Sequence, residues 1–204
     1  MWEYIKWGEA QGFHRKSGTK TRKPWYVLPK QALTGGEIIW PCRAGQRHIV
    51  AYNPKRIISH RFYRIHYSDD AKVFAAYLNS SFVAMCAEVF AGAALGQGVL
   101  DLTKPTIAEI PVIDCSRLQR KEALSLCQHL DNLSTEPTTS LLTQCGYDKG
   151  TSKCRDENGV SHARLELDLT VGHILGLSET ETRHVREIAC NLIDNRYSKA
   201  QSVG

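Results

Sequence analysis

At 204 residues, the chain is long enough for one domain with an appendage or for two small domains. Its 42% hydrophobic and 23% charged residues exclude a disordered or fibrous protein. No apolar run approaches the roughly 20 residues of a membrane-spanning helix, and the first residues carry no hydrophobic signal core. Seven cysteines, odd in number and irregularly spaced, are typical of reduced thiols. We therefore expect a cytoplasmic protein that does not contact a membrane.

Positive charge is concentrated in the first third of the chain. Residues 1–68 contain 13 Lys and Arg against 3 acidic residues, whereas the remainder contains 13 against 18. Such an asymmetry is expected when one surface faces a polyanion and the rest does not. Nucleic acid is therefore the expected partner, and binding rather than chemistry is the expected role.

The first 67 residues are predicted to form short strands joined by turns, because β-branched and aromatic residues alternate with Gly and Pro turn signals. The predicted strands are residues 2–7, 24–29, 37–40, 47–52 and 61–67. Strands of this length and spacing favour a small, twisted, mostly antiparallel sheet.

A helix is predicted at residues 69–92, with Ser68 as its N-cap and apolar residues at helical spacing. This helix should pack on the sheet. In the loop that follows, Gly96 and Gly98 are interpreted as points where the backbone approaches another surface closely. Two further strands are predicted after the helix, at residues 99–102 and 107–113.

The last third of the chain is predicted to be helical. Ser116 with Gln119 resembles a capping box that opens one helix. Gly176 is placed to end a second helix. Ser178 with Glu181 caps a third.

These elements predict an α+β fold, a small twisted sheet with a packed helix followed by a helical C-terminal appendage. The expected domains are a nucleic-acid-binding domain at residues 1–114 and a helical region at residues 115–204. Residues 134–162 are rich in Thr, Ser, Gly and charge, so a flexible linker is predicted within the second region.

A basic loop at residues 14–23 is the strongest physical signal for nucleic-acid binding. Cations on a turn can reach successive phosphates and release counterions, which gives salt-sensitive affinity. A solvated loop without a partner would have the same composition. The candidate phosphate contacts are Arg15, Lys16, Lys20, Arg22 and Lys23.

A second polar group, Arg43, Gln46 and Arg47, is placed where a hairpin would end. Arg can form two hydrogen bonds to the O6 and N7 atoms of guanine, and Gln can do the same to adenine. These three residues are therefore the candidates for reading bases, although an ordinary hairpin tip is the alternative.

No complete catalytic motif is present, because phosphate-loop, nucleophile-elbow and zinc-protease patterns are all missing. Asn53-Pro54 matches only the first two residues of the Asn-Pro-Pro-aromatic element with which amino-group DNA methyltransferases hold a flipped base. The acids Asp101, Glu109 and Asp114 lack the neighbouring Lys of a nuclease site and are interpreted as strand-edge charges.

Cys145, Cys154 and His162 lie in a polar stretch that a metal ion could organise. No Cys-x-x-Cys pair occurs anywhere in the chain, and structural zinc sites usually have such tight ligand spacings. We therefore expect no metal site.

Six motifs occur in an order that is typical of one family. They are Tyr4-Ile5-Lys6-Trp7-Gly8-Glu9, Arg22-Lys23-Pro24-Trp25-Tyr26-Val27-Leu28, Arg61-Phe62-Tyr63, Tyr77-Leu78-Asn79-Ser80-Ser81, Gly96-Gln97-Gly98-Val99-Leu100-Asp101-Leu102 and Ile110-Pro111-Val112. Together they resemble the C-terminal target recognition domain of adenine-specific DNA methyltransferases of restriction-modification systems. The TaqI-like gamma class and the fused type II restriction-methylation enzymes are the most similar groups.

This resemblance implies that the chain recognises a sequence in double-stranded DNA and positions an adenine for flipping and methylation. In the family, S-adenosylmethionine and the catalytic motif belong to a separate domain, and neither motif occurs in this sequence. The chain is therefore expected to hold no cofactor and to be non-catalytic on its own. It resembles either a C-terminal part of such an enzyme or a separately encoded recognition subunit.

Three alternatives remain open at this point. A type I-like specificity subunit would dock a separate modification subunit through its helices. A structured-RNA-binding module would also explain the basic first third, and a small nuclease would use Asp101 or Glu109.

Overall fold

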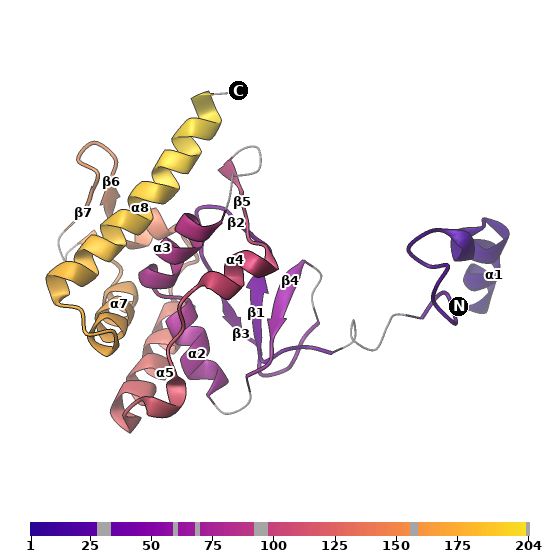
Figure 1. Cartoon of the computed structure of the whole chain (residues 1–204), viewed down its shortest axis with the longest axis horizontal. Coiled ribbons are helices and arrows are strands. Elements are labelled where there is room, and N and C mark those ends of the chain that lie inside the picture. Colours follow the sequence, from indigo (N-terminus) through magenta and orange to yellow (C-terminus); the bar gives the residue numbers. More distant parts are fainter. Residues whose placement is uncertain (28–33, 59–60, 68–69, 92–97, 156–158, 203–204) are drawn as a thin grey trace.

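The computed structural model describes residues 1–27, 34–58, 61–67, 70–91, 98–155 and 159–202. Helices and small antiparallel sheets together confirm the α+β class (Figure 1). Residues 1–27 form a small lobe, and the rest of the described chain forms the main body. No single described helix is long and apolar enough to cross a membrane; the helices at 71–78 and 81–90 reach that length only as a pair bent by 64°.

The lobe is helical, so the predicted strand at residues 2–7 is wrong. Helix α1 spans Trp2–Ala10 and the short 3-10 helix η1 spans Phe13–Arg15. The aromatic residues that suggested a strand meet at helical spacing instead, since the Tyr4 and Trp7 rings stack with centroids 5.4 Å apart.

The second strand predicted in this region, at residues 24–29, is replaced by a turn over its described part. There the Val27 N–H donates to the Pro24 carbonyl at 3.1 Å. Residues 28 and 29 lie outside the described residues.

A three-stranded antiparallel sheet forms close to where it is predicted, in the order β3-β1-β4. Its strands are β1 (Ile38–Pro41), β3 (Ala51–Tyr52) and β4 (Phe62–Ile65). β1 is central because it pairs with both other strands, and Ile38 and Trp40 on one of its faces are buried, with 0% and 4% exposure. A second, two-stranded sheet pairs β2 (Arg43–Ala44) with β5 (Leu100–Asp101), which confirms the strand predicted at 99–102.

The helix predicted at residues 69–92 is broken in two. The pieces are α2 (Ala71–Leu78) and α3 (Ser81–Phe90). Ser80 is the N-cap of α3, and its hydroxyl accepts the Val83 N–H at 3.3 Å. The predicted N-cap Ser68 lies outside the described residues, and Asp70 precedes α2. We name the break at residues 79–81 the helix elbow.

Residues predicted as a strand at 107–113 form helix α4 (Lys104–Glu109) and an extended stretch, so that prediction is wrong. Thr103 caps α4 by accepting the Thr106 N–H at 3.3 Å, and Pro105 lies in the first turn. This local start signal outweighs the β-prone residues that follow it.

The next elements are η4 (Cys115–Arg117) and α5 (Arg120–Thr135). The capping box of α5 consists of Gln119 and Glu122, so the box predicted at Ser116 and Gln119 is displaced by three residues. Ser116 instead donates its N–H to Asp114, which caps η4.

The segment predicted as a flexible linker, residues 134–162, contains regular structure in its described part. Its elements are α6 (Leu141–Gln144), β6 (Tyr147–Asp148) and β7 (Lys153–Cys154), the last two paired as an antiparallel hairpin. Leu141, Cys145 and Cys154 are buried in a smaller core against the last helix. The polar composition thus belongs to the exposed side of a folded segment.

The last two helices are α7 (His162–Ile174) and α8 (Glu179–Ser202). Gly176 has a φ of 74° just after α7, as its predicted role at a helix end requires. The predicted cap of α8 is also confirmed, because Ser178 and Glu181 exchange side-chain to backbone hydrogen bonds of 2.8 and 3.2 Å.

One main core runs from β1 to α7, and α2 lies between β3 and α5 (Figure 1). This core contains side chains from both sides of residue 114. The domain boundary at that residue stays a prediction.

Beneath the helix elbow lies a buried charged pair of α7, Arg164 and Asp168, with 2% and 3% exposure. Asp168 accepts the N–H and the hydroxyl of Ser81 at 2.8 and 2.7 Å. The Arg164 guanidinium donates to the Asn79 carbonyl and to Gln144. Burial raises the pKa of Asp168 although Arg164 opposes the rise. The pair therefore forms hydrogen bonds with the Ser81 N–H and the Asn79 carbonyl, two backbone groups at the helix break.

Replacing Asp168 with Ala should lower the free energy of unfolding by about 3–5 kcal/mol, because Arg164 would keep a buried charge without a counter-ion. A urea titration followed by circular dichroism measures this change. Asp131→Ala is the matched control, since its ion pair with Lys72 is largely exposed and such pairs contribute about 0–1 kcal/mol. Equal losses in the two variants would contradict the role given to Asp168.

Candidate nucleic-acid interface

The three residues predicted to read bases lie on one short stretch of the main body, which we name the 43–50 segment. Arg43 opens it in β2, and Gln46 and Arg47 follow where the chain leaves that strand. The Arg43 side chain is 55% exposed, Arg47 is exposed and Gln46 is half-buried. The structure thus brings the three candidates together, while their contact with bases stays a prediction.

Gln46 and Val50 of the 43–50 segment are tied to α6 and to the helix elbow. Asn79 accepts the Val50 N–H at 3.1 Å and donates to the Val50 carbonyl at 2.6 Å. The Gln46 carbonyl accepts the N–H of Leu141 at 2.9 Å. These bonds replace a sheet ladder, which explains why the strand predicted at 47–52 is shortened to β3.

Two other residues of the segment, Gly45 and His48, are tied to α8 and α3. The Gly45 carbonyl accepts a hydrogen bond from Arg196 at 3.0 Å. His48 Nε2 lies 2.7 Å from Glu88 Oε1, and both side chains are buried. With these residues anchored, the segment has the fixed backbone that precise recognition requires.

Arg43 is the only one of the three candidates for which the structure gives an ion pair within the described residues. Its Nε lies 3.7 Å from Asp101 Oδ1, across the β2–β5 pair. Both side chains are about half exposed, so the attraction is weak and Arg43 remains free to contact a ligand.

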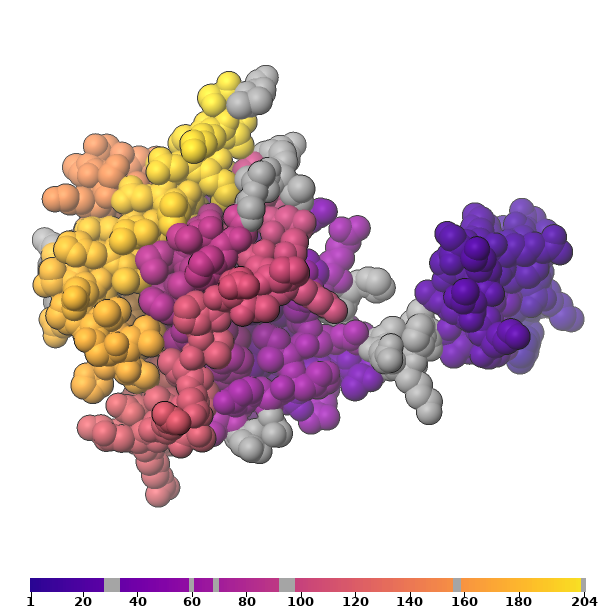
Figure 2. Space-filling view, viewed as in Figure 1, coloured from indigo at the N-terminus to yellow at the C-terminus, as the bar shows by residue number. Residues whose placement is uncertain are grey.

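The five predicted phosphate contacts all lie in the lobe, which Figure 2 shows as a separate mass. Lys16, Lys20 and Lys23 are exposed, as is Arg15 at the end of η1, and Arg22 is half-buried. The stretch is folded rather than open, because the Lys20 and Arg22 N–H groups close successive turns at 2.8 and 2.9 Å. The turns place these cations on a compact surface.

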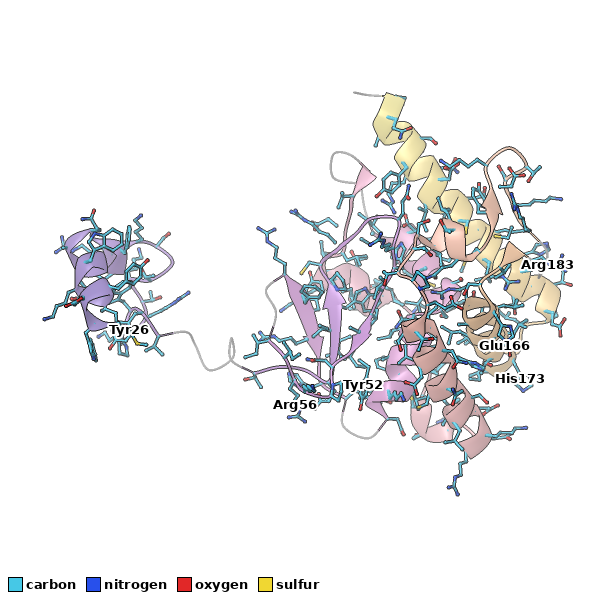
Figure 3. The ribbon with its side chains drawn as sticks, turned by 180° about the vertical axis from the view of Figure 1, so that it is seen from behind. Tyr26, Tyr52, Arg56, Glu166, His173 and Arg183 are labelled. Atoms are coloured by element: carbon cyan, nitrogen blue, oxygen red, sulfur yellow. The ribbon has the colours of Figure 1, made fainter. Side chains whose placement is uncertain are left out.

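The lobe also carries a cluster of aromatic rings, one of which contacts a candidate cation. The Lys16 ammonium lies 4.4 Å from the centre of the Phe13 ring, and Trp25 donates to Glu9 at 3.0 Å. Trp2 and Tyr4 are 66% and 73% exposed. Figure 3 labels Tyr26 on this lobe and Tyr52 on the main body. The candidate phosphate and base contacts therefore belong to two different parts of the chain.

A cavity of about 380 Å³ opens beside Arg47, between the 43–50 segment, α2 and α5. Leu130 and Pro137 belong to its wall, and Asn79 and Arg164 lie at its lining. Both of these polar side chains already have hydrogen-bond partners. The cavity offers no unsatisfied group among them for a ligand.

The three acids considered for a nuclease belong to different elements and have different neighbours. Asp101 faces Arg43, Glu109 ends α4, and Asp114 accepts the Ser116 N–H and hydroxyl. The Ser116 hydrogen bonds lower the pKa of Asp114 below its usual value. Among the residues that the structure describes, no group of three or more His, Cys, Asp or Glu side chains could hold a metal ion.

Cys145 and Cys154, two of the residues weighed for zinc, lie in the smaller core together with Cys190. His162 is exposed at the start of α7 and does not belong to that core. Cys190 is fully buried, as expected for a cysteine that packs as a small apolar side chain.

The Asn53-Pro54 dipeptide has a structural role. Asn53 is 5% exposed, and its amide nitrogen donates to the carbonyls of Gly36 and Ile57 at 2.9 Å each. Its amide oxygen accepts the Ile57 N–H at 3.0 Å. The Asn53 amide therefore holds the backbone of this turn through both of its donors and its oxygen.

Sequence reasoning missed the contribution of α8 to this interface. Arg196 and Tyr197 pack against Gly45 and Gly98, and a Cβ on Gly98 would lie 3.2 Å from the Tyr197 ring. The close backbone approach predicted for Gly98 is thus confirmed, whereas Gly96 lies outside the described residues. No local pattern marks Arg196, because its partners are distant in the sequence.

The lobe, the sheet and the helix elbow all fall within residues 1–144, which match one protein-family model. This match assigns the chain to the class of methyltransferase C-terminal domains. In particular, the chain belongs to the family described as type II methyltransferase M.Eco57I, C-terminal domain. Comparisons with curated proteins and with solved structures found no match.

Gly98→Ala should lower the free energy of unfolding by about 1–3 kcal/mol, because its φ of 70° strains a side chain and Tyr197 occupies the space. Thermal unfolding measures the loss. Gly176→Ala is the control, since its φ is 74° and a Cβ there meets nothing within 4 Å. If Gly98→Ala cost no more than Gly176→Ala, contact with α8 would not contribute.

Proposed function

We propose that this chain is the sequence-specific DNA recognition domain of an adenine-specific DNA methyltransferase of a restriction-modification system. It positions duplex DNA for base flipping and methylation by a catalytic domain outside these 204 residues. Membership of the family supports the methyltransferase context. That catalytic domain belongs either to the same polypeptide or to a separate modification subunit.

One observation carries this proposal: the 43–50 segment combines an anchored backbone with exposed long polar side chains. Direct reading of bases requires Arg or Gln side chains that project from a rigid support. Arg43 and Arg47 have this exposure, and Gln46 lies between them. The segment thus suits major-groove recognition.

The lobe contributes affinity rather than specificity. Residues 1–27 carry six Lys and Arg and two acidic residues. Cations that contact phosphates fix the register of a protein on DNA but read no sequence. The five candidates of the lobe therefore supply the salt-dependent part of binding.

The chain does not transfer the methyl group in this proposal. S-adenosylmethionine binds the catalytic domain, and the chain itself holds no cofactor. The buried Asn53 amide supports this division, since both of its N–H donors and one acceptor site of its oxygen are used by Gly36 and Ile57.

Binding to duplex DNA should weaken steeply with salt, and neutralising the lobe should reduce that dependence. The variant replaces Arg15, Lys16, Lys20, Arg22 and Lys23 with Gln. The slope of log K against log salt is negative. Each lost phosphate contact reduces its magnitude by about 0.9, so the five together reduce it by up to about 4.5. Mobility-shift titrations at several salt concentrations measure the slope.

The matched control neutralises five exposed cations of the main body. These are Lys104, Arg120, Lys121, Lys153 and Lys199. It should keep the slope of the unmodified chain. Equal slopes for the lobe variant and the unmodified chain would contradict the phosphate role, and stronger competition by structured RNA than by duplex DNA would favour an RNA-binding module.

Truncating Arg43 or Arg47 to Ala should relax specificity rather than abolish binding. A preferred duplex is first selected from a random pool with the unmodified chain. Each truncation should then lose about 1–3 kcal/mol of discrimination at one base position, whereas Lys20→Ala should weaken all sequences alike. Competition binding against single-base variants measures this. Uniform weakening by the Arg substitutions would rule out base reading.

A further inference from the structure

The C-terminal helix α8 reaches the 43–50 segment through one side chain. Arg196 donates to both carboxylate oxygens of Glu88, at 2.8 Å from Nε and 2.6 Å from Nη2. The same guanidinium donates to the carbonyls of Gly45 and Gly98. Arg196 therefore joins α3, α8 and the strands β2 and β5 at one point.

Glu88 links Arg196 to a second residue of the segment, His48. Its side chain is 2% exposed, and Oε1 lies 2.7 Å from His48 Nε2. Burial alone would raise the pKa of Glu88, but hydrogen bonds from His48 and Arg196 outweigh it and hold the pKa below its usual value. A charged carboxylate thus lies between two donors.

The two contacts flank two of the three candidate base-reading residues, Gln46 and Arg47. Gly45 immediately precedes Gln46, and His48 immediately follows Arg47. Rotation of either peptide would redirect the side chains between them. Arg196 itself has a side chain only 8% exposed, so it acts on these residues and not on a ligand.

We propose that Arg196, through Glu88 and the Gly45 carbonyl, is a positioning residue that sets the sequence discrimination of the 43–50 segment. This inference rests on the proposed function. It assigns a part in recognition to residues after 144, beyond the stretch that matches the family model.

The segment has a second set of anchors that does not involve Arg196. Asn79 holds both backbone groups of Val50, and the Leu141 N–H holds the Gln46 carbonyl. Loss of Arg196 therefore removes one set of anchors and leaves the other in place. Discrimination should fall while binding to phosphates persists.

The experiment compares Arg196→Gln with the unmodified chain on a preferred duplex, selected from a random pool, and on a scrambled duplex. The ratio of the two affinities should fall roughly 5- to 150-fold, the range of one well-placed base contact. The affinity for the scrambled duplex and its salt slope should not change. Lys199→Gln, an exposed cation of the same helix, should alter neither quantity.

Arg196→Lys is measured in parallel, because it keeps the cation but loses the planar fork that binds Glu88 at two points. Its ratio of affinities should lie between those of the unmodified chain and Arg196→Gln. If Arg196→Gln does not fold, the ratio measured for Arg196→Lys tests the inference by itself. An unchanged ratio in a folded variant overturns the inference, as does an equal loss on both duplexes. An unmodified chain without sequence preference would instead overturn the proposed function.

Discussion

A charged pair buried beneath a helix break supports the rest of this structure. Helix α2 is buried along most of its length and α3 over its first half, and the elbow between them leaves backbone groups in the interior. Arg164 and Asp168 of α7 satisfy those groups at Asn79 and Ser81. An interior break without such partners would be unfavourable, because unpaired polar groups are costly to bury.

The elbow also fixes the position of the candidate interface. The Asn79 carbonyl faces Arg164, while the Asn79 amide holds Val50 at the end of the 43–50 segment. A single residue therefore transmits the position of α7 to the segment that carries Arg43 and Arg47. Core packing and the proposed recognition of DNA therefore share one set of hydrogen bonds.

Local signals made part of the fold predictable, and tertiary partners decided the rest. Gly176 and the Ser178–Glu181 cap were readable because a helix end needs particular residue types at fixed spacing. The strand prediction for residues 2–7 was wrong, because aromatic residues are compatible with a helix as well as with a strand. At the interface, charge identified the candidate cations, but the bond from Arg196 to Glu88 spans 108 residues and leaves no pattern in the sequence.

The anchors of the 43–50 segment grip mainly backbone atoms, the carbonyls of Gly45 and Gln46 and both groups of Val50. Almost any amino acid supplies such atoms. Residues 43, 46 and 47 can therefore be exchanged without loss of these supports, whereas position 45 must stay small, because the Tyr197 hydroxyl lies 3.1 Å from where a Cβ would be. Under the proposed function, substitutions at these three positions would change the preferred DNA sequence while the hydrogen bonds that hold the backbone stay the same.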